Sequence, residues 1–224
     1  MDKVKLKIRA AIMFPLAAVV VWLMLFLPAG SLEYFQGWVF MGVIFIPCIL
    51  VVAYFLKNDP ELLARRMKYK EKEVEQRMIV KLSGLFFFIG FLIPGFDYRY
   101  GWSNVPTFIV IISNILVLVG YFIVFLVFKE NTYTARTIQV EKGQKVISTG
   151  PYSLIRHPMY FGVILMYLPM STALGSYWAL IFFVLSIIPI FFRAVHEEKI
   201  LKRDLPGYGE YMKKVKYRLI LGIW

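Results

Sequence analysis

An uncharged stretch of 29 residues separates Arg99 from Lys129 and reads YGWSNVPTFIVIISNILVLVGYFIVFLVF, from residue 100 to residue 128. A transmembrane α-helix needs about 20 predominantly apolar residues. The chain is 59% hydrophobic and 18% charged, whereas a soluble domain has roughly 45–50% apolar and about 25% charged residues. Four more uncharged stretches occur, at residues 10–32, 34–56, 82–96 and 157–192. The sequence therefore predicts an all-α integral membrane protein and excludes a soluble globular domain.

The longest uncharged stretch, residues 157–192, is too long for one membrane helix. Its 36 residues would extend for about 54 Å as a continuous helix, far beyond a hydrocarbon core of about 30 Å. Pro169, Gly175 and Ser176 lie in its middle and favour a turn, so we expect a helical hairpin. The first stretch exceeds the apolar region of a signal peptide, so we expect it to be retained as a helix. We predict six transmembrane helices, over residues 10–28, 36–56, 78–97, 105–128, 159–171 and 175–193.

Basic residues indicate the topology. Six helices place both termini and the loops 57–81 and 129–158 on one side of the membrane, which then carries 25 of the 26 Lys and Arg residues. Only Arg99 remains on the other side. Cytoplasmic loops of membrane proteins carry an excess of Lys and Arg, so we expect both termini to be cytoplasmic. This topology accounts for the net charge of +12 without a nucleic-acid partner.

Two segments on the basic side have the character of interfacial helices. Asn58 or Asp59 can cap a helix over residues 59–77, with Pro60 at its first position. The Lys- and Arg-rich segment after residue 193 is expected to form an amphipathic C-terminal tail. Cys48 is the only cysteine, which excludes a disulfide framework and a cysteine-rich metal site.

The predicted membrane helices contain almost no ionisable residues, which argues against a transporter or a channel. A membrane enzyme with its site at the cytoplasmic face and a non-enzymatic membrane protein remain. His157-Pro158 is expected to open a helix, whose free N–H groups and positive dipole end suit an anion. Arg193 and Glu197 are four residues apart and share one helical face.

These segments resemble one enzyme family. The resemblance rests on Gly150-Pro-Tyr-x-x-x-Arg-His-Pro-x-Tyr160-x-Gly162, on Arg193-x-x-x-Glu197-Glu198, on Tyr208-x-x-Tyr211-x-x-x-Val215 and on Arg218-Leu-Ile. In this order the motifs resemble the isoprenylcysteine carboxyl methyltransferase family, most closely its prokaryotic branch. Phospholipid methyltransferases and NADPH-dependent sterol reductases are its wider relatives. The resemblance covers about residues 129–224.

The resemblance implies an S-adenosylmethionine-dependent methyltransferase, with S-adenosylhomocysteine as the product and no metal. It divides the chain into an N-terminal transmembrane region, 1–104, and a catalytic region, 105–224. The latter would comprise a span, a cofactor loop over 129–158, the hairpin 159–193 and the cytoplasmic tail. Glu197 would hold the α-ammonium of the cofactor, and Arg193 would face the methyl acceptor. The implied cofactor pocket is lined by Gln144, Lys145, Val146, Ile147, Tyr152, His157, Pro158, Met159, Tyr160 and Glu197.

The acceptor is expected to be lipophilic, because it must reach the pocket from the bilayer. The first hypothesis is carboxylate O-methylation of an isoprenylcysteine-like or other lipid-like substrate. The second hypothesis is phospholipid N-methylation of the ethanolamine type. A sterol-reductase-like enzyme is a weaker alternative, because Met159 replaces the Asn that those enzymes tend to carry. A lipid-filled tunnel that ends near Arg193 would favour a carboxylate, and one that ends near acidic residues with Arg193 turned away would favour an amine. The sequence does not indicate an oligomeric state.

Several further residues are candidates for the site. A neutral amine acceptor would need a proton acceptor, for which His196 or Glu198 are candidates. The segment after the fourth predicted helix, Asn131-Thr-Tyr-Thr-Ala-Arg136, resembles a motif of the prokaryotic branch. Asn131 and Arg136 are therefore candidates for substrate contact, and Thr137 or Gln139 for cofactor contact.

Overall fold

The computed structural model describes residues 3–67, 74–134, 140 and 143–224, and the regular secondary structure within these ranges is entirely helical. The helices are α1 (Lys3–Ala29), α2 (Phe35–Asn58), α3 (Pro60–Arg66), α4 (Val74–Tyr100), α5 (Thr107–Glu130), η1 (Gly150–Ser153), α6 (Pro158–Ala173), α7 (Leu180–Asp204) and α8 (Tyr208–Lys214).

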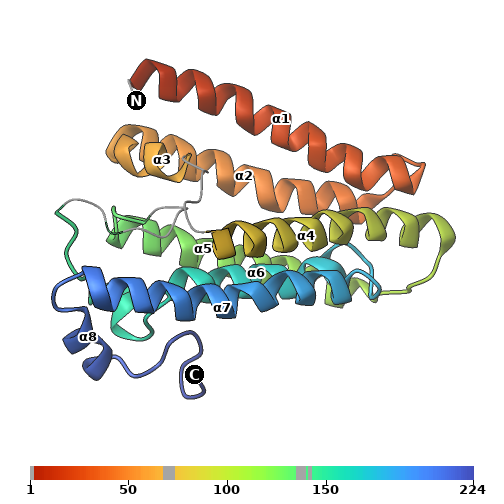
Figure 1. Ribbon diagram of the computed structural model, residues 1–224. Coiled ribbons are helices and arrows are strands. Elements are labelled where there is room, and N and C mark those ends of the chain that lie inside the picture. Colours follow the sequence, from red (N-terminus) through yellow and green to blue (C-terminus); the bar gives the residue numbers. More distant parts are fainter. Residues whose placement is uncertain (1–2, 68–73, 135–139, 141–142) are drawn as a thin grey trace.

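The long helices run alternately up and down in one bundle (Figure 1). Among the described residues, α1, α2, α4, α5 and α7 are each long and apolar enough to cross a membrane. Helix α6 has 16 residues and is about 24 Å long, but it lies in the bundle beside α5 and α7. The prediction of an all-α membrane protein is therefore confirmed, with α6 as the shorter arm of the predicted hairpin.

Two glycines bring α6 close to α5. A Cβ atom built on Gly120 would lie 2.7 Å from the carbonyl oxygen of Gly162, and one built on Gly162 would lie 3.0 Å from that of Gly120. Only glycine permits backbones to approach this closely, as small residues do between membrane helices generally. The contact fixes the position of α6, whose first turn carries the His-Pro motif.

Several helix boundaries differ from those expected. Helix α7 continues to Asp204, so its 25 residues are about 37 Å long, and its last turns extend beyond a hydrocarbon core of about 30 Å. The helix predicted over residues 59–77 is shorter: Asp59 caps α3 by accepting the N–H of Leu62 at 3.0 Å, but α3 ends at Arg66. Residues 68–73 lie outside the described ranges, and α4 begins at Val74.

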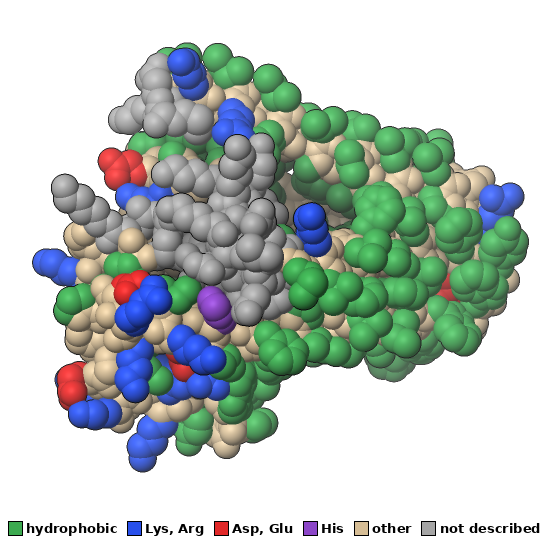
Figure 2. Space-filling view, viewed as in Figure 1, with side chains coloured by type: hydrophobic (Ala, Val, Ile, Leu, Met, Phe, Trp, Pro, Cys, Tyr) green, Lys and Arg blue, Asp and Glu red, His purple; other side chains and the backbone are tan. Residues whose placement is uncertain are grey.

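The N-terminus, α3, η1 and α8 lie at the same end of the bundle (Figure 1). Lys and Arg side chains gather at this end, whereas hydrophobic side chains cover the middle of the molecule (Figure 2). This separation follows from the alternation of charged loops and uncharged helices in the sequence. We call this end the basic end.

At the opposite end, Asp97 joins α4 to the turn between α6 and α7. Its side chain is buried, and it accepts hydrogen bonds from the N–H and hydroxyl of Ser103, at 2.6 and 2.7 Å, and from the hydroxyl of Ser176. A buried carboxylate is tolerated only when hydrogen bonds replace its hydration. Asp97 therefore fixes the far end of the bundle.

The chain after α8 folds back against the start of α6. The carbonyl groups of Tyr217 and Arg218 accept the N–H groups of Arg156 and His157, each at 2.9 Å. Leu219 is fully buried in an apolar cluster with Tyr160 and Ala194. The predicted C-terminal tail is thus packed against the protein at residues 215–219.

Candidate functional site

The His-Pro motif stands at the first turn of α6, as the sequence predicts. Gly150 adopts a positive φ of 55° and begins the short helix η1, after which Arg156 and His157 turn inward and are buried. Pro158 occupies the first helical position, and the His157 side chain makes no capping hydrogen bond to the helix. The start of α6 therefore keeps its positive dipole end and places two cationic or titratable side chains in the interior.

Glu198 holds these side chains together. It is 4% exposed and accepts hydrogen bonds from Arg156 Nε at 2.6 Å and from Arg218 Nε at 2.8 Å, and its Oε1 lies 3.3 Å from His157 Nε2. Both oxygens are thus engaged, and the cluster joins α6, α7 and the C-terminal tail. Glu198 has the role of a buried counter-ion, which argues against its use as a proton acceptor.

Tyr160 connects Arg193 with Glu197. Its hydroxyl donates a hydrogen bond to Glu197 Oε2 at 2.6 Å and accepts one from Arg193 Nε at 3.1 Å. The rings of His157 and Tyr160 stack, with centroids 5.4 Å apart. The predicted pairing of Arg193 and Glu197 on one face of α7 is therefore bridged by a side chain from α6.

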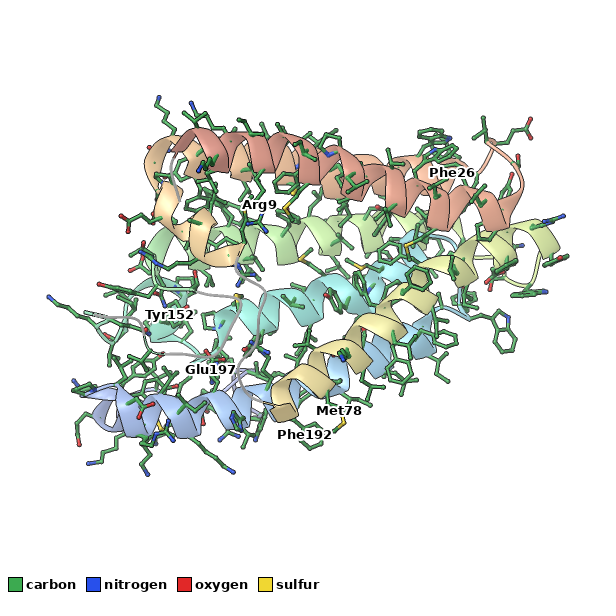
Figure 3. All side chains as sticks on the ribbon, turned by 45° about the horizontal axis from the view of Figure 1, so that its top comes forward. Arg9, Phe26, Met78, Tyr152, Phe192 and Glu197 are labelled. Carbon is green, nitrogen blue, oxygen red and sulfur yellow. The ribbon has the colours of Figure 1, made fainter. Side chains whose placement is uncertain are left out.

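A polar cleft lies between η1, the start of α6, α7 and α8, and it has an empty volume of about 790 Å³, including its open mouth. Figure 3 shows Tyr152 and Glu197 approaching each other from η1 and α7 at this end of the bundle. All ten residues of the predicted cofactor pocket line it. The lining consists of Asn131, Tyr133, Thr134, Gln144, Lys145, Val146, Ile147, Tyr152, Arg156, His157, Pro158, Met159, Tyr160, Glu197, Leu201, Leu205, Tyr208 and Tyr211.

The tyrosines of the polar cleft differ in their hydrogen bonds. The Tyr152 hydroxyl accepts a hydrogen bond from Asn131 Nδ2 at 3.0 Å, and the Tyr211 hydroxyl donates one to the carbonyl of Tyr152 at 2.7 Å. The Tyr208 hydroxyl is buried and has no hydrogen-bond partner among the described residues. Burial, reinforced by the negative charges of Glu198 and Glu197, raises the pKa of Tyr208. A buried hydroxyl without a partner is a group that a ligand can satisfy.

A second cleft, the membrane cleft, opens between α4, α6 and α7, and it has an empty volume of about 1090 Å³, including its open mouth. Its lining consists of Arg66, Val80, Ser83, Gly84, Phe87, Met159, Tyr160, Val163, Tyr167, Pro189, Ile190 and Arg193. Met159 and Tyr160 line both clefts. These two side chains form the boundary at which the clefts meet.

The other residues that the sequence predicts for the site do not all line the same cleft. Arg193 lines the membrane cleft, whereas Asn131, a candidate for substrate contact, lines the polar cleft. His196 lines neither of these clefts, and its Nε2 atom is buried without a hydrogen-bond partner among the described residues. Arg136, Thr137 and Gln139 lie outside the described ranges.

Several residues that line the two clefts are absent from the sequence prediction, among them Tyr208 and Arg66. Tyr208 belongs to a motif of the resemblance, but its spacing alone does not indicate that its hydroxyl is buried. Arg66 lies in α3, and its Nη1 atom lies 3.6 Å from Met159 Sδ. A mixed-charge segment gives no signal for such a position, because the contact depends on how α3 packs against α5 and α6.

Comparison with known proteins supplies the enzyme class. Residues 108–206 match the phospholipid methyltransferase family, and no curated protein matches the chain. The match extends from the start of α5 to just beyond the end of α7, and it favours a methyltransferase over a reductase or a non-enzymatic protein. It does not distinguish the isoprenylcysteine branch. With its apolar helices and this matched segment, the protein is a membrane methyltransferase.

Proposed function

We propose that the protein transfers a methyl group from S-adenosylmethionine, bound in the polar cleft, to the carboxylate of a lipid-like acceptor in the membrane cleft. The observation that carries this proposal is the meeting of the two clefts at Met159 and Tyr160. One cleft is polar and lies at the basic end. The other is largely apolar and ends at Arg193.

The residues of the polar cleft fit the chemical groups of the cofactor. Glu197 can accept hydrogen bonds from the α-ammonium, and the start of α6 offers a positive dipole end to the α-carboxylate. The Tyr208 hydroxyl, which is buried without a partner among the described residues, can bond to the adenosine. S-adenosylmethionine, when bound, supplies a methyl group on a sulfonium, so that the reaction needs no metal.

A carboxylate acceptor suits the residues at the end of the membrane cleft. Arg193 can orient a carboxylate through charge-assisted hydrogen bonds, while the Tyr160 hydroxyl, which is itself bonded to Glu197, positions the Arg193 guanidinium. One carboxylate oxygen forms the new bond to the methyl carbon as the bond from that carbon to sulfur breaks, giving a methyl ester and a neutral thioether. An ionised carboxylate has no proton to lose, so this step needs no general base. Alignment of the reactants can supply about 7–11 kcal/mol.

An amine acceptor is the second candidate, because the matched family is that of the phospholipid methyltransferases. An amine must lose a proton before it can attack. Among the described residues that line the membrane cleft there is no Asp, Glu or His. Arg66 and Arg193 would also repel a protonated amine. The composition of this cleft therefore supports a carboxylate over an amine.

We propose that the site faces the cytoplasm. The polar cleft is lined in part by η1 and α8, and these two helices lie at the basic end together with both termini (Figure 1). In the six-helix topology this side carries 25 of the 26 basic residues, and basic loops are retained on the cytoplasmic side. A cofactor dissolved in the cytoplasm would then reach the polar cleft directly.

Calorimetry of the detergent-solubilised chain with S-adenosylhomocysteine tests the cofactor site. We expect binding to the unmodified protein and to Glu210→Gln, a control at an exposed glutamate of α8 that is paired with Lys213. Glu197→Gln should weaken binding at least about tenfold, as expected for loss of a charge-assisted hydrogen bond. Absence of binding to the unmodified protein, or equal binding by both variants, would overturn the proposed site.

A further inference from the structure

One wall of the membrane cleft comes from the N-terminal half of the chain, outside the segment 108–206 that matches the methyltransferase family. Arg66 lies at the end of α3, and α4 contributes Val80, Ser83, Gly84 and Phe87. Helices α6 and α7 form the opposite wall. The acceptor proposed above therefore has to pass between one wall that lies inside the segment matching the family and one wall that lies outside it.

Two guanidinium groups lie near the boundary of the clefts. Arg66 Nη1 lies 3.6 Å from Met159 Sδ, and its Cζ lies 4.8 Å from the centroid of the Phe128 ring. Arg193 Nε lies 3.1 Å from the Tyr160 hydroxyl. Met159 and Tyr160 are neighbours in sequence, so both arginines approach the point where the two clefts meet. Guanidinium groups bind carboxylates through paired hydrogen bonds, and the rest of this cleft is largely apolar.

Gly84 leaves space in the wall formed by α4. A Cβ atom built at this position would meet nothing within 4 Å, so the absence of a side chain is not required by helix packing. Further along α4 the cleft is bounded by Phe87 and Tyr167, whose ring centroids are 4.7 Å apart. From Val80 to Phe87 the helix rises by about 10 Å. The space beside Gly84 lies between the charged end and this aromatic end.

We infer that Arg66 and Arg193 together bind the anionic group of the acceptor and that Gly84 sets the thickness of the chain that lies beside it. The occupant is an amphiphile with a terminal carboxylate, because two cations line a largely apolar cleft between the membrane helices α4, α6 and α7. This inference rests on the proposed function, and it assigns selection of the acceptor to the N-terminal half.

The charge requirement is tested by binding of N-palmitoylglycine and of its methyl ester to the detergent-solubilised chain saturated with S-adenosylhomocysteine. The unmodified protein should prefer the carboxylate at least about tenfold. Arg66→Gln should remove most of this preference, and Arg66→Lys should restore part of it. Arg203→Gln, which removes an exposed charge paired with Asp204, is the matched control and should retain the preference. Equal binding of acid and ester by the unmodified protein, or an unchanged preference in Arg66→Gln, would overturn the inference.

The width requirement is tested with Gly84→Phe. We expect this variant to keep its affinity for S-adenosylhomocysteine but to bind N-acetyl-S-farnesylcysteine at least about tenfold more weakly than the unmodified protein does. Gly42→Phe is the control, because a Cβ atom there would approach only Ile46, at 3.8 Å, and Gly42 does not line the cleft. Unchanged binding in Gly84→Phe, or equal losses in the two variants, would contradict the role of Gly84.

The proposed function and the role of Arg66 and Gly84 can fail separately. If S-adenosylhomocysteine does not bind the unmodified protein, the proposed function fails. If it binds, and a carboxylate is methylated, while Arg66→Gln and Gly84→Phe have no effect on acceptor binding, only the present inference fails.

Discussion

The Tyr160 hydroxyl donates a 2.6 Å hydrogen bond to Glu197 and thereby joins the two clefts. Tyr160 lines both clefts and also accepts a hydrogen bond from Arg193. The phenol of Tyr160 thus orients both the Glu197 carboxylate, which we propose binds the cofactor, and the Arg193 guanidinium, which we propose binds the acceptor. This arrangement makes Tyr160 a positioning residue.

Tyr160→Phe should weaken binding of S-adenosylhomocysteine and of the acceptor together, each by about tenfold, the effect of one hydrogen bond to a charged group. Calorimetry with each ligand separately measures the two effects. Tyr177→Phe, at an exposed tyrosine of the opposite end, is the control. If Tyr160→Phe weakens only one ligand, the phenol does not join the two subsites.

Tyr208→Phe should lower the affinity for S-adenosylhomocysteine by about fivefold without lowering the Tm of the ligand-free protein. The physical reason is that the lost hydroxyl has no partner among the described residues, so its removal leaves no protein group unsatisfied. Tyr211→Phe should instead lower the Tm, because its hydroxyl bonds to the Tyr152 carbonyl. A fall in Tm with unchanged affinity in Tyr208→Phe would contradict the assignment.

The same residue gives a prediction about pH. Because burial and then the charges of Glu198 and Glu197 raise the pKa of Tyr208, its hydroxyl stays protonated above the ordinary tyrosine pKa of about 10. Ionisation of Tyr208 therefore does not affect the free energy of unfolding below that pH, and the free energy of unfolding falls as pH rises from there through the raised folded-state pKa. The ratio of the affinities of the unmodified protein and of Tyr208→Phe for S-adenosylhomocysteine should therefore be constant between about pH 7 and about pH 9.5. A decline of this affinity ratio between about pH 7 and about pH 9.5 would show that the Tyr208 phenol ionises in that range.

Glu198→Gln should destabilise the fold strongly, by about 3–5 kcal/mol, because it leaves Arg156, Arg218 and His157 without their buried anion. Glu197→Gln offers the matched comparison one residue earlier, since it should lower ligand affinity with a much smaller change in Tm. Thermal unfolding in detergent, with and without S-adenosylhomocysteine, separates the two effects. Similar Tm values for the two variants would contradict the structural role of Glu198.

Asp97→Ala should lower the free energy of unfolding by about 3 kcal/mol, because the hydroxyl of Ser176 and the N–H of Ser103 lose a buried acceptor. Asp97 lies at the opposite end from the polar cleft, so the affinity for S-adenosylhomocysteine should not change. Ser176→Ala removes one of the three hydrogen bonds to Asp97 and the bond that its hydroxyl accepts from the Ala179 N–H, and it should cost only about 1–2 kcal/mol. A loss of ligand affinity in protein that remains folded would show that the two ends are coupled.

The membrane helices followed closely from the sequence, and the family resemblance supplied ten of the 18 residues that line the polar cleft. Uncharged stretches and their flanking charges locate the helices, because burial of an unpaired charge in hydrocarbon is costly. The His157-Pro158 motif marks a helix start by local chemistry alone. The ten predicted cofactor residues line one cleft because they belong to a loop, a helix start and a neighbouring helix face, although their contact with a cofactor remains a prediction.

Contacts between distant segments could not be predicted in the same way. The hydrogen bonds of Arg156 and His157 to the tail carbonyls, and the position of Arg66 beside Met159, depend on packing between segments that are far apart in sequence. The burial of Asp97 likewise depends on the turn between α6 and α7. Hydropathy patterns contain no information on which side chains meet across such distances, because many arrangements bury the same apolar faces.

The central claim is tested most directly by the chemistry of the methylated product. The chain is incubated in lipid vesicles with S-adenosylmethionine that carries a labelled methyl group, and N-acetyl-S-farnesylcysteine and phosphatidylethanolamine are supplied as competing acceptors. The account predicts label in the carboxylate acceptor that mild base releases as methanol, and loss of this label in Arg193→Gln. Label that resists base and resides on the amine of the phospholipid would contradict it.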